Sequence, residues 1–210
     1  MRISLAQSVG ASGHHGRVSS PVDLPPPRDI EAHVGDLVAE LAHHLGERRV
    51  VDLCVELLEG ADARDHLPEL AYLTGLDFGP AGHELEAWSA YWPRSWGARG
   101  LLYVWDDSAT PAVVAGLADE HWRPAEMCLK VATRHEVAGA GDGAAALSTH
   151  ELPRVRAQAL RTLAVTGDTE HVAAVRDRLD DDHEGVRRQA ARALERMAQR
   201  LDLDDVDDQS

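Results

Sequence analysis

The chain has 210 residues, enough for one sizeable hydrophobic core or two small ones. Apolar residues make up 44% of it and aromatic residues only 4%, so Ala, Leu and Val must build most of the core. Its 36 acidic residues outnumber 21 basic residues, which gives a formal net charge of −15. Nucleic acids and anionic membranes repel such a charge, which argues against a general binder of either.

Residues 1–28 contain Gly, Ser, His and Pro without any helical or alternating period, and we predict a flexible arm. Residues 29–85 show apolar residues at helical spacing, which predicts an irregular helical N-terminal half. Three glycines mark expected helix ends: Gly46, Gly60 and Gly75. Residues 76–82 predict a loop, and no stretch shows the alternation of a strand. The acidic residues 202–210 predict a disordered tail.

The second half of the chain contains an internal repeat with an offset of 31 residues. Residues 155–163 match residues 186–194, so that Val155 meets Val186, and both segments carry apolar residues at i, i+4 and i+8, one face of a helix. Weaker copies precede them at Pro124 and Pro93. A second helix is expected in each copy. Its intermediate copy, residues 142–147, is rich in Ala and Gly and is expected about one residue out of register.

A single helix–turn–helix unit cannot bury its apolar face, whereas stacked units share a continuous core. We therefore predict an all-α fold, an α-α superhelix, with repeats of period 31 over residues 86–201. The last copy has only its first helix, through about Leu201, and is polar enough to cap the stack.

The repeat carries the pattern Leu-x-Asp-x-x-x-x-Val-Arg, which resembles the HEAT-repeat family, especially the short bacterial type also found in phycobilin lyases. Leu179, Asp181, Val186 and Arg187 match it fully. Other copies depart from it: Pro124 and Ala125 replace Val and Arg, His150 replaces Asp, and the first copy keeps Arg94 without the Asp. The resemblance covers about residues 86–201, and more loosely 30–75. It implies an armadillo-like α-α superhelix whose curved surface holds a protein partner.

The repeated Asp and Arg residues predict a structural ladder, formed by Asp119, Arg156, Asp181 and Arg187. Asp181 lies in the turn before a helix, where it can accept hydrogen bonds from free backbone N–H groups. Arg156 and Arg187 lie one repeat apart, so the two residue types can form charge-assisted bonds along the stack. Replacing Arg156 with Ala should loosen packing rather than abolish one activity.

Motifs for catalysis, metals and cofactors are not found in the sequence. Four His-Glu pairs lack the second His four residues later that a zinc-binding helix needs, so we predict no metal. Cys54 and Cys128 fall on apolar helical positions, which favours buried hydrophobes over nucleophiles. Residues 139–143 hold three alternating glycines but no following Gly-Lys-Ser/Thr, which favours a turn over a phosphate loop. We predict no cofactor.

Five Trp in a chain with one Phe are unusual, and they gather between residues 88 and 122. Pro93 is expected to break a single helix between Trp92 and Trp96. One interpretation is packing where the irregular half meets the repeats, which is favoured because Trp is usually largely buried. The other is an aromatic hot spot for a partner. The residues of that partner-binding set are Trp88, Tyr91, Trp92, Arg94, Trp96, Arg99, Trp105 and Trp122.

The first function hypothesis is a non-catalytic scaffold that binds a protein partner. The net charge favours a basic partner and disfavours nucleic acid. The alternative is a HEAT-like enzyme that uses the Trp cluster as a pocket. It would resemble a DNA glycosylase, which cradles alkylated bases with Trp and an acidic residue, or a phycobilin lyase. Asp106 and Asp107 beside Trp105 keep the glycosylase reading open, although such an enzyme needs a basic groove.

Compartment and source follow from composition. Two distant cysteines form no disulfide framework, and no apolar run approaches the roughly 20 residues of a membrane span. The N-terminus lacks the apolar segment of a signal peptide, so we expect a cytoplasmic protein. Lys130 is the only lysine and Asn is absent, which indicates a GC-rich bacterial genome.

Overall fold

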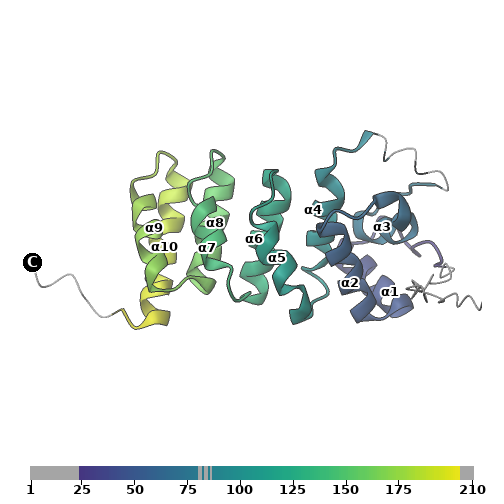
Figure 1. The fold of residues 1–210 in the computed structure, drawn as a ribbon, viewed down its shortest axis with the longest axis horizontal. Helices are drawn as coiled ribbons and strands as arrows, with labels where there is room; N and C mark the ends of the chain where they lie inside the picture. The colour runs from purple at the N-terminus through teal and green to yellow at the C-terminus, as the bar shows by residue number, and fades with distance from the viewer. Residues whose placement is uncertain (1–23, 80–81, 83–84, 86, 204–210) are drawn as a thin grey trace, which may run out of the picture.

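The computed structural model describes residues 24–79, 82, 85 and 87–203. Every regular element within them is helical and none is a strand, which confirms the predicted all-α fold class. The helices follow one another along the long axis, from α1 at one end to α10 at the other (Figure 1). The molecule is therefore an α-α helical-repeat solenoid. Most of the predicted arm and tail, residues 1–23 and 204–210, lies outside the described residues.

The N-terminal part consists of α1 (Val34–Leu45), α2 (Glu47–Leu58) and α3 (Leu67–Thr74), with the short 3-10 helix η1 (Ala63–His66) before α3. Apolar residues face several sides of α2, and six of them are buried: Val50, Val51, Leu53, Cys54, Leu57 and Leu58. This helix therefore forms the centre of the N-terminal core.

From residue 91 onward the helices follow a strict period. Each of four helices begins 31 residues after the one before: α4 (Tyr91–Gly100), α6 (Trp122–His135), α8 (Pro153–Thr166) and α10 (Glu184–Leu201). The shorter helices between them keep the same interval: α5 (Thr110–Gly116), α7 (Gly141–Leu147) and α9 (Val172–Arg176). Three 3-10 turns complete the order: η3 (Asp107–Ala109), η4 (Thr169–His171) and η5 (Asp177–Asp180).

The structure corrects the expectation that residues 142–147 are out of register. Ala144 is buried at the position that Val113 and Val175 occupy in the neighbouring units. The copy is hard to recognise in sequence because a small side chain replaces Val. Leu179, the Leu of the repeat pattern, is 36% exposed, because α9 ends at Arg176 and the chain continues as η5.

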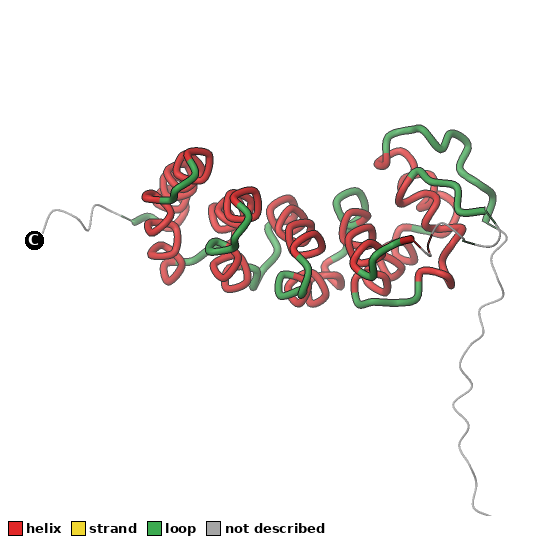
Figure 2. Tube along the Cα trace, turned by 90° about the horizontal axis from the view of Figure 1, so that it is seen from above, coloured by secondary structure: helices red, strands yellow, loops and turns green. Residues whose placement is uncertain are grey.

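The long helices form one layer. α2, α4, α6, α8 and α10 contact each other in that order, while α5, α7 and α9 each pack against the long helix that follows. The tube in Figure 2 shows these pairs succeeding each other along the molecule. Positions that are equivalent by the 31-residue period therefore lie beside each other on neighbouring helices of the layer.

Pro93 does not break a helix, which corrects the sequence-based expectation. Because α4 begins at Tyr91, Pro93 lies in its first turn, where the missing N–H has no helical partner to lose. Trp92 and Trp96 therefore share one helix, and Trp88 precedes it.

Two glycines bring α4 against α2 at close range. A Cβ atom at Gly97 would lie 2.5 Å from the carbonyl oxygen of Cys54 and 2.9 Å from Cβ of Leu57. A Cβ at Gly100 would clash with Sγ of Cys54. The irregular N-terminal half and the regular repeats thus meet at a contact that only glycine allows.

We expect Gly97→Ala to lower the free energy of unfolding by about 2 kcal/mol or more, because the new methyl group meets backbone atoms that cannot move aside. Urea unfolding followed by circular dichroism measures the change. The matched control is Gly185→Ala in α10, whose Cβ would meet only the ring of the exposed His183, at 3.1 Å. Equal effects of the two substitutions would contradict the proposed close contact.

Candidate functional site

Three Trp rings form a group where α4 begins. The ring centroids of Trp92 and Trp96 lie 6.0 Å apart, and each lies 6.4 Å from that of Trp88. Trp88 also packs edge-on against Phe78 at 5.2 Å. All three Trp residues are only half-buried, so their rings belong partly to the junction and partly to the surface.

The aromatic group continues onto α6 through stacked cations and rings. The Arg123 guanidinium lies 4.8 Å from the ring centroid of Trp92 and 4.6 Å from that of Trp122. Tyr91 stacks on His121 with centroids 3.6 Å apart. Trp92 on α4 is therefore connected to Trp122 on α6 by an arginine held between two rings.

The same pattern extends to both sides. The Arg154 guanidinium, from α8, lies 4.9 Å from the ring centroid of Trp122 and also holds Glu126 at 2.7 Å. Arg99 lies 4.9 Å from the centroid of Trp96. We call this set the arginine–tryptophan surface: Trp92, Trp96, Arg99, Trp122, Arg123 and Arg154.

The repeat explains how three helices build this surface. Trp92, Arg123 and Arg154 occupy the second position of α4, α6 and α8, one period apart. Stacking of the helices then places them next to each other. Sequence reasoning missed Arg123, Arg154 and His121, although the 31-residue period already aligns both arginines with Trp92.

Two residues of the predicted partner-binding set lie elsewhere. Trp105 stacks on His135, at the other end of α6, with centroids 4.5 Å apart, and its Nε1 donates to Asp107. Burial lowers the pKa of His135. A hydrogen bond to the Leu101 carbonyl acts in the opposite direction but is the smaller effect. Arg94 is turned into the helix stack by an ion pair with Asp119.

Two Asp–Arg pairs tie consecutive units together. Arg156 Nε and Nη2 donate to the two carboxylate oxygens of Asp181 at 2.8 and 2.7 Å. Arg94 makes the same pair of bonds with Asp119, at 2.6 and 3.0 Å. Arg187, which follows the last Asp, donates instead to the Asp181 carbonyl at 2.7 Å. Among the four residues predicted as a ladder, the structure therefore pairs Arg156 with Asp181, while the partner of Asp119 is Arg94.

The middle unit lacks this pair, because Ala125 and His150 hold the equivalent positions. Other polar contacts join α6 to α8 there. The hydroxyl oxygens of Thr133 and Thr162 lie 2.9 Å apart, and Gln158 Nε2 donates to Thr133 at 3.2 Å.

In two of the four His-Glu pairs, the histidine accepts a backbone hydrogen bond in the turn where a helix begins. In each of four turns, Nδ1 of a histidine accepts from the backbone N–H two residues later, at 3.0 to 3.2 Å: His33, His121, His150 and His183. The pair at His135 lies at the end of α6, and the pair at residues 83–84 lies outside the described residues. Within the part of the chain that the structure describes, no three His, Cys, Asp or Glu residues gather as metal ligands.

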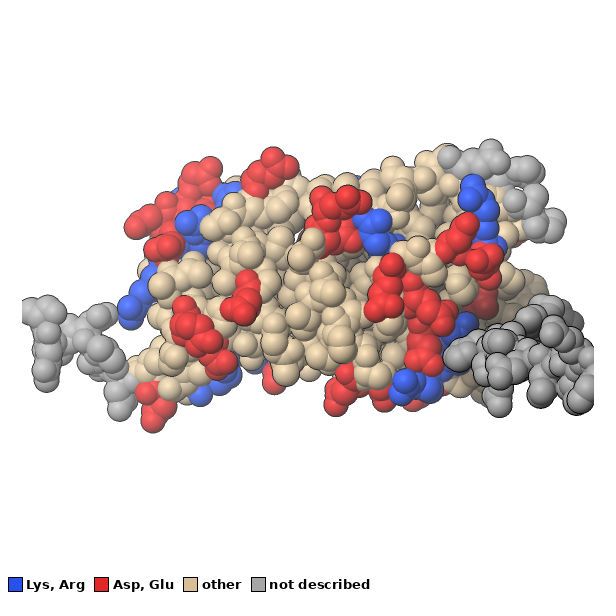
Figure 3. All heavy atoms as spheres, viewed as in Figure 1, with Lys and Arg blue, Asp and Glu red and all other residues tan. Residues whose placement is uncertain are grey.

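The four long helices that follow the 31-residue period carry a charge opposite to that of the whole chain. α4, α6, α8 and α10 together contain 13 of the 21 basic residues but only three acidic residues: Glu126, Glu184 and Glu195. The acidic excess therefore lies in the other segments. On the face drawn in Figure 3, acidic side chains are more widespread than basic ones.

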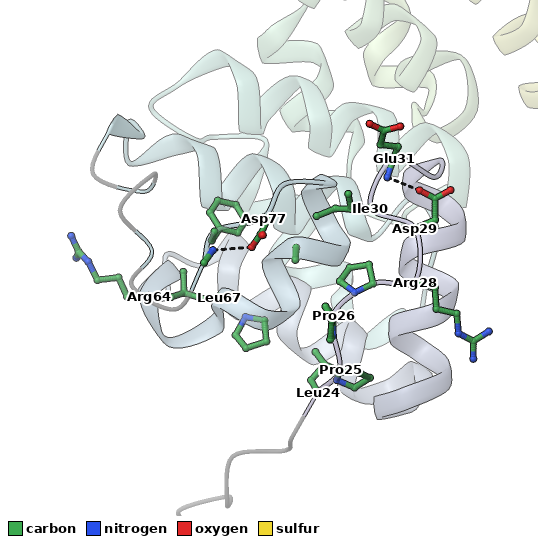
Figure 4. A pocket seen from close by; sticks show the side chains of 15 residues that line it. Leu24, Pro25, Pro26, Arg28, Asp29, Ile30, Glu31, Arg64, Leu67 and Asp77 are labelled. Atoms are coloured by element: carbon green, nitrogen blue, oxygen red, sulfur yellow. Dashed lines mark hydrogen bonds between the residues drawn. The ribbon is translucent and has the colours of Figure 1, made fainter.

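A pocket of about 1050 Å³ lies at the N-terminal end, between residues 24–31 and the start of α3. Its walls include Leu24, Pro25, Ile30 and Leu67, whereas Arg28 and Arg64 point outward (Figure 4). The carboxylates of Asp29 and Asp77 accept from backbone N–H groups two residues on, at 3.0 and 2.9 Å. These polar groups are therefore used within their own turns and do not converge on a ligand.

The two cysteines are buried, as the sequence predicted. Burial raises the pKa of the Cys54 thiol to about 12 and that of Cys128 further still, which keeps both thiols protonated. The glycine-rich residues 139–143 lie between α6 and the first turn of α7, with Gly139 in a left-handed conformation.

Asp181 links this geometry to pH. Burial opposes its ionisation, but hydrogen bonds from Arg156 and the His183 amide outweigh burial and lower the pKa from 3.8 to about 2. A carboxyl whose folded pKa is depressed stabilises the fold above its unfolded pKa. That stability is lost as pH falls from about 4 to 2.

We therefore expect Asp181→Asn to lower the free energy of unfolding by about 3 kcal/mol at pH 7, because it leaves Arg156 buried without its partner. The variant should also lose part of the decline in stability between pH 4 and 2. Urea unfolding across this range measures both effects. Asp182→Asn is the control, since Asp182 also contacts Arg156 but its side chain is 89% exposed. A loss as large in the control would argue against the buried pair.

We expect His183→Ala to destabilise the protein by about 1 kcal/mol, since the first turn of α10 loses its side-chain acceptor. His183→Asn should restore most of the loss, because Asn caps helix starts well. Thermal unfolding of the three proteins compares them. No difference between the Ala and Asn variants would rule out the capping role.

Comparisons with known proteins agree with the repeat pattern. The sequence model of the HEAT-repeat family matches residues 144–208, which confirms the predicted resemblance there. The crystal structure of an engineered protein is similar at a TM-score of 0.46 and 16% identity, over 80% of this chain and 97% of that one. No curated protein matches in sequence. None of the described helices is long and apolar enough to cross a membrane. Residues 144–208 are therefore similar to HEAT repeats, and they form part of a longer helical-repeat solenoid.

Proposed function

We propose that the protein is a non-catalytic scaffold that binds a protein partner through the arginine–tryptophan surface. The observation that carries this proposal is the alternation of rings and cations across α4, α6 and α8, in the order Trp92, Arg123, Trp122, Arg154. The Arg123 guanidinium, stacked by its face, keeps its N–H edge available for a carboxylate or another acceptor, whereas the edge of Arg154 already binds Glu126. Half-buried Trp rings next to such groups are typical of binding hot spots.

The charge of the surface favours an acidic partner. The earlier expectation of a basic partner rests on the net charge of −15, which is an average over the whole chain. The four period-31 helices of that layer, α4, α6, α8 and α10, have 13 basic and three acidic residues. Opposite charge steers association and suppresses wrong partners, so we assign acidic partners to this layer. A basic partner stays a prediction for the acidic remainder of the molecule.

An enzyme on this scaffold has less support. The glycosylase interpretation needs a free acidic residue close to the Trp group. Asp106 and Trp105 lie towards the far end of α6, and Glu126, four residues from Trp122, is paired with Arg154. His135, on which Trp105 stacks, is 13 residues from Trp122, or about 20 Å along the helix. Asp106 accepts from the Ser108 amide and lies 3.5 Å from Arg48. If the protein were a phycobilin lyase, mixing it with a bilin would give visible absorbance. This measurement tests that alternative separately.

The proposal is tested by cross-linking mass spectrometry after capture of partners from the native lysate. We expect acidic proteins cross-linked near α4, α6 and α8, released by high salt, and lost with Arg123→Glu. Arg28→Glu is the matched control, because it makes the same charge change at an exposed side chain at the N-terminal end of the molecule, away from this layer. Cross-links confined to other faces, or equal capture by both variants, would refute the proposed surface.

A further inference from the structure

A set of cations that shares Arg99 with the arginine–tryptophan surface continues beside it, with one member on each of the four period-31 helices. Arg99, Lys130, Arg161 and Arg192 are separated by 31 residues each, on α4, α6, α8 and α10. Neighbouring helices of the layer are in contact, so these four positions follow one another across it. We call this set the basic column.

The basic column is largely without internal partners. Among the described residues, no carboxylate lies within ion-pair distance of Arg99, Arg161 or Arg192. Lys130 shares Glu126 with Arg154, at 3.4 Å. Arg161 donates to Gln158 at 3.2 Å, and Arg99 lies over Trp96. In a chain with 15 more acidic than basic residues, a row of four cations of which three lack a carboxylate is unexpected unless a partner supplies the carboxylates.

The spacing of the column indicates the shape of that partner. Packed helices lie about 8–10 Å apart, whereas an extended peptide in the polyproline II conformation advances about 3.1 Å per residue and brings every third side chain to the same side. Three residues of extended chain therefore span one helix spacing. We infer that the basic column binds an extended acidic protein segment that places a carboxylate at every third residue, one for each repeat unit. Four contacts would then cover about ten residues, or about 30 Å.

Charge density favours an acidic segment over nucleic acid. A nucleic-acid strand carries a phosphate at every nucleotide, more closely spaced than the helices of the layer. Such a polyanion would also extend beyond the column toward the acidic segments of the molecule, which repel it. A peptide with four spaced carboxylates matches the column and leaves no excess charge against the acidic remainder.

This inference rests on the proposed function, because it names the class of partner that the same layer takes. Its test uses the full-length chain and two labelled twelve-residue peptides of equal composition. One peptide repeats Glu-Gly-Ser four times, and the other holds its four Glu residues consecutively. Fluorescence anisotropy at low salt gives both affinities, and a twelve-nucleotide oligo-dT serves as the nucleic-acid probe.

We expect the spaced peptide to bind at least fivefold more tightly than the consecutive one. Arg161→Glu, an exposed change at the third position of the column, should weaken the spaced peptide at least tenfold and remove the preference. Arg192→Glu should do the same less strongly, because it alters the end of the column. Arg28→Glu, an exposed change at the N-terminal end of the molecule, should change either affinity less than twofold. Circular dichroism confirms that each variant is folded.

The other outcomes each contradict a different statement. If the two peptides bind with equal affinity and Arg161→Glu weakens both, the spacing inference is overturned but an acidic partner is kept. Tighter binding of oligo-dT than of either peptide would replace the acidic segment with nucleic acid. No peptide binding, while the captured partners still depend on Arg123, would overturn this inference alone. No binding in either experiment would overturn the proposed function as well.

Discussion

Stacking is the constraint on which this molecule depends, because a helix pair with one apolar face is stable only when the next pair covers it. The equal interval between helix starts, from Tyr91 to Glu184, keeps every unit in the same orientation. Buried residues such as Ala144 then meet their equivalents, and Gly97 lets the first repeat approach α2. The bonds from Arg94 to Asp119 and from Arg156 to Asp181 connect units that share few other polar contacts.

The same constraint organises the surface. When a residue type recurs at the same outward position of each repeat, its copies form a row across the layer. The period alone places them there. Trp92, Arg123 and Arg154 form one such row, and the basic column forms another beside it. The acidic residues of the chain lie mostly in other segments, so opposite charges are separated in space rather than mixed. A net charge of −15 therefore describes the whole chain but not the face that we propose for binding.

Much of the fold could be predicted, because Val155 and Val186 repeat a long apolar pattern that only stacked helices satisfy. The register of α7 could not, since Ala144 and the neighbouring glycines give a weak signal. The candidate site was predicted in part. Trp92, Trp96 and Trp122 do lie together, but Trp105 is close to them only in sequence. Arg123 and Arg154 were missed because they belong to the site through the 31-residue period, which aligns them with Trp92, and not through their residue type.

By itself, the sequence determined the helical period, the stacked all-α architecture, the burial of both cysteines and the Asp and Arg positions between units. These features follow from the spacing of residues along the chain, which can be read directly from the sequence. Only the tertiary structure decided that Arg94 turns inward, that histidines cap helix starts, and that Arg123 lies between two Trp rings. Each of these depends on side chains from different units meeting or on the conformation of a turn. The direction of a single side chain is set by its neighbours in space, which the spacing of apolar residues does not specify.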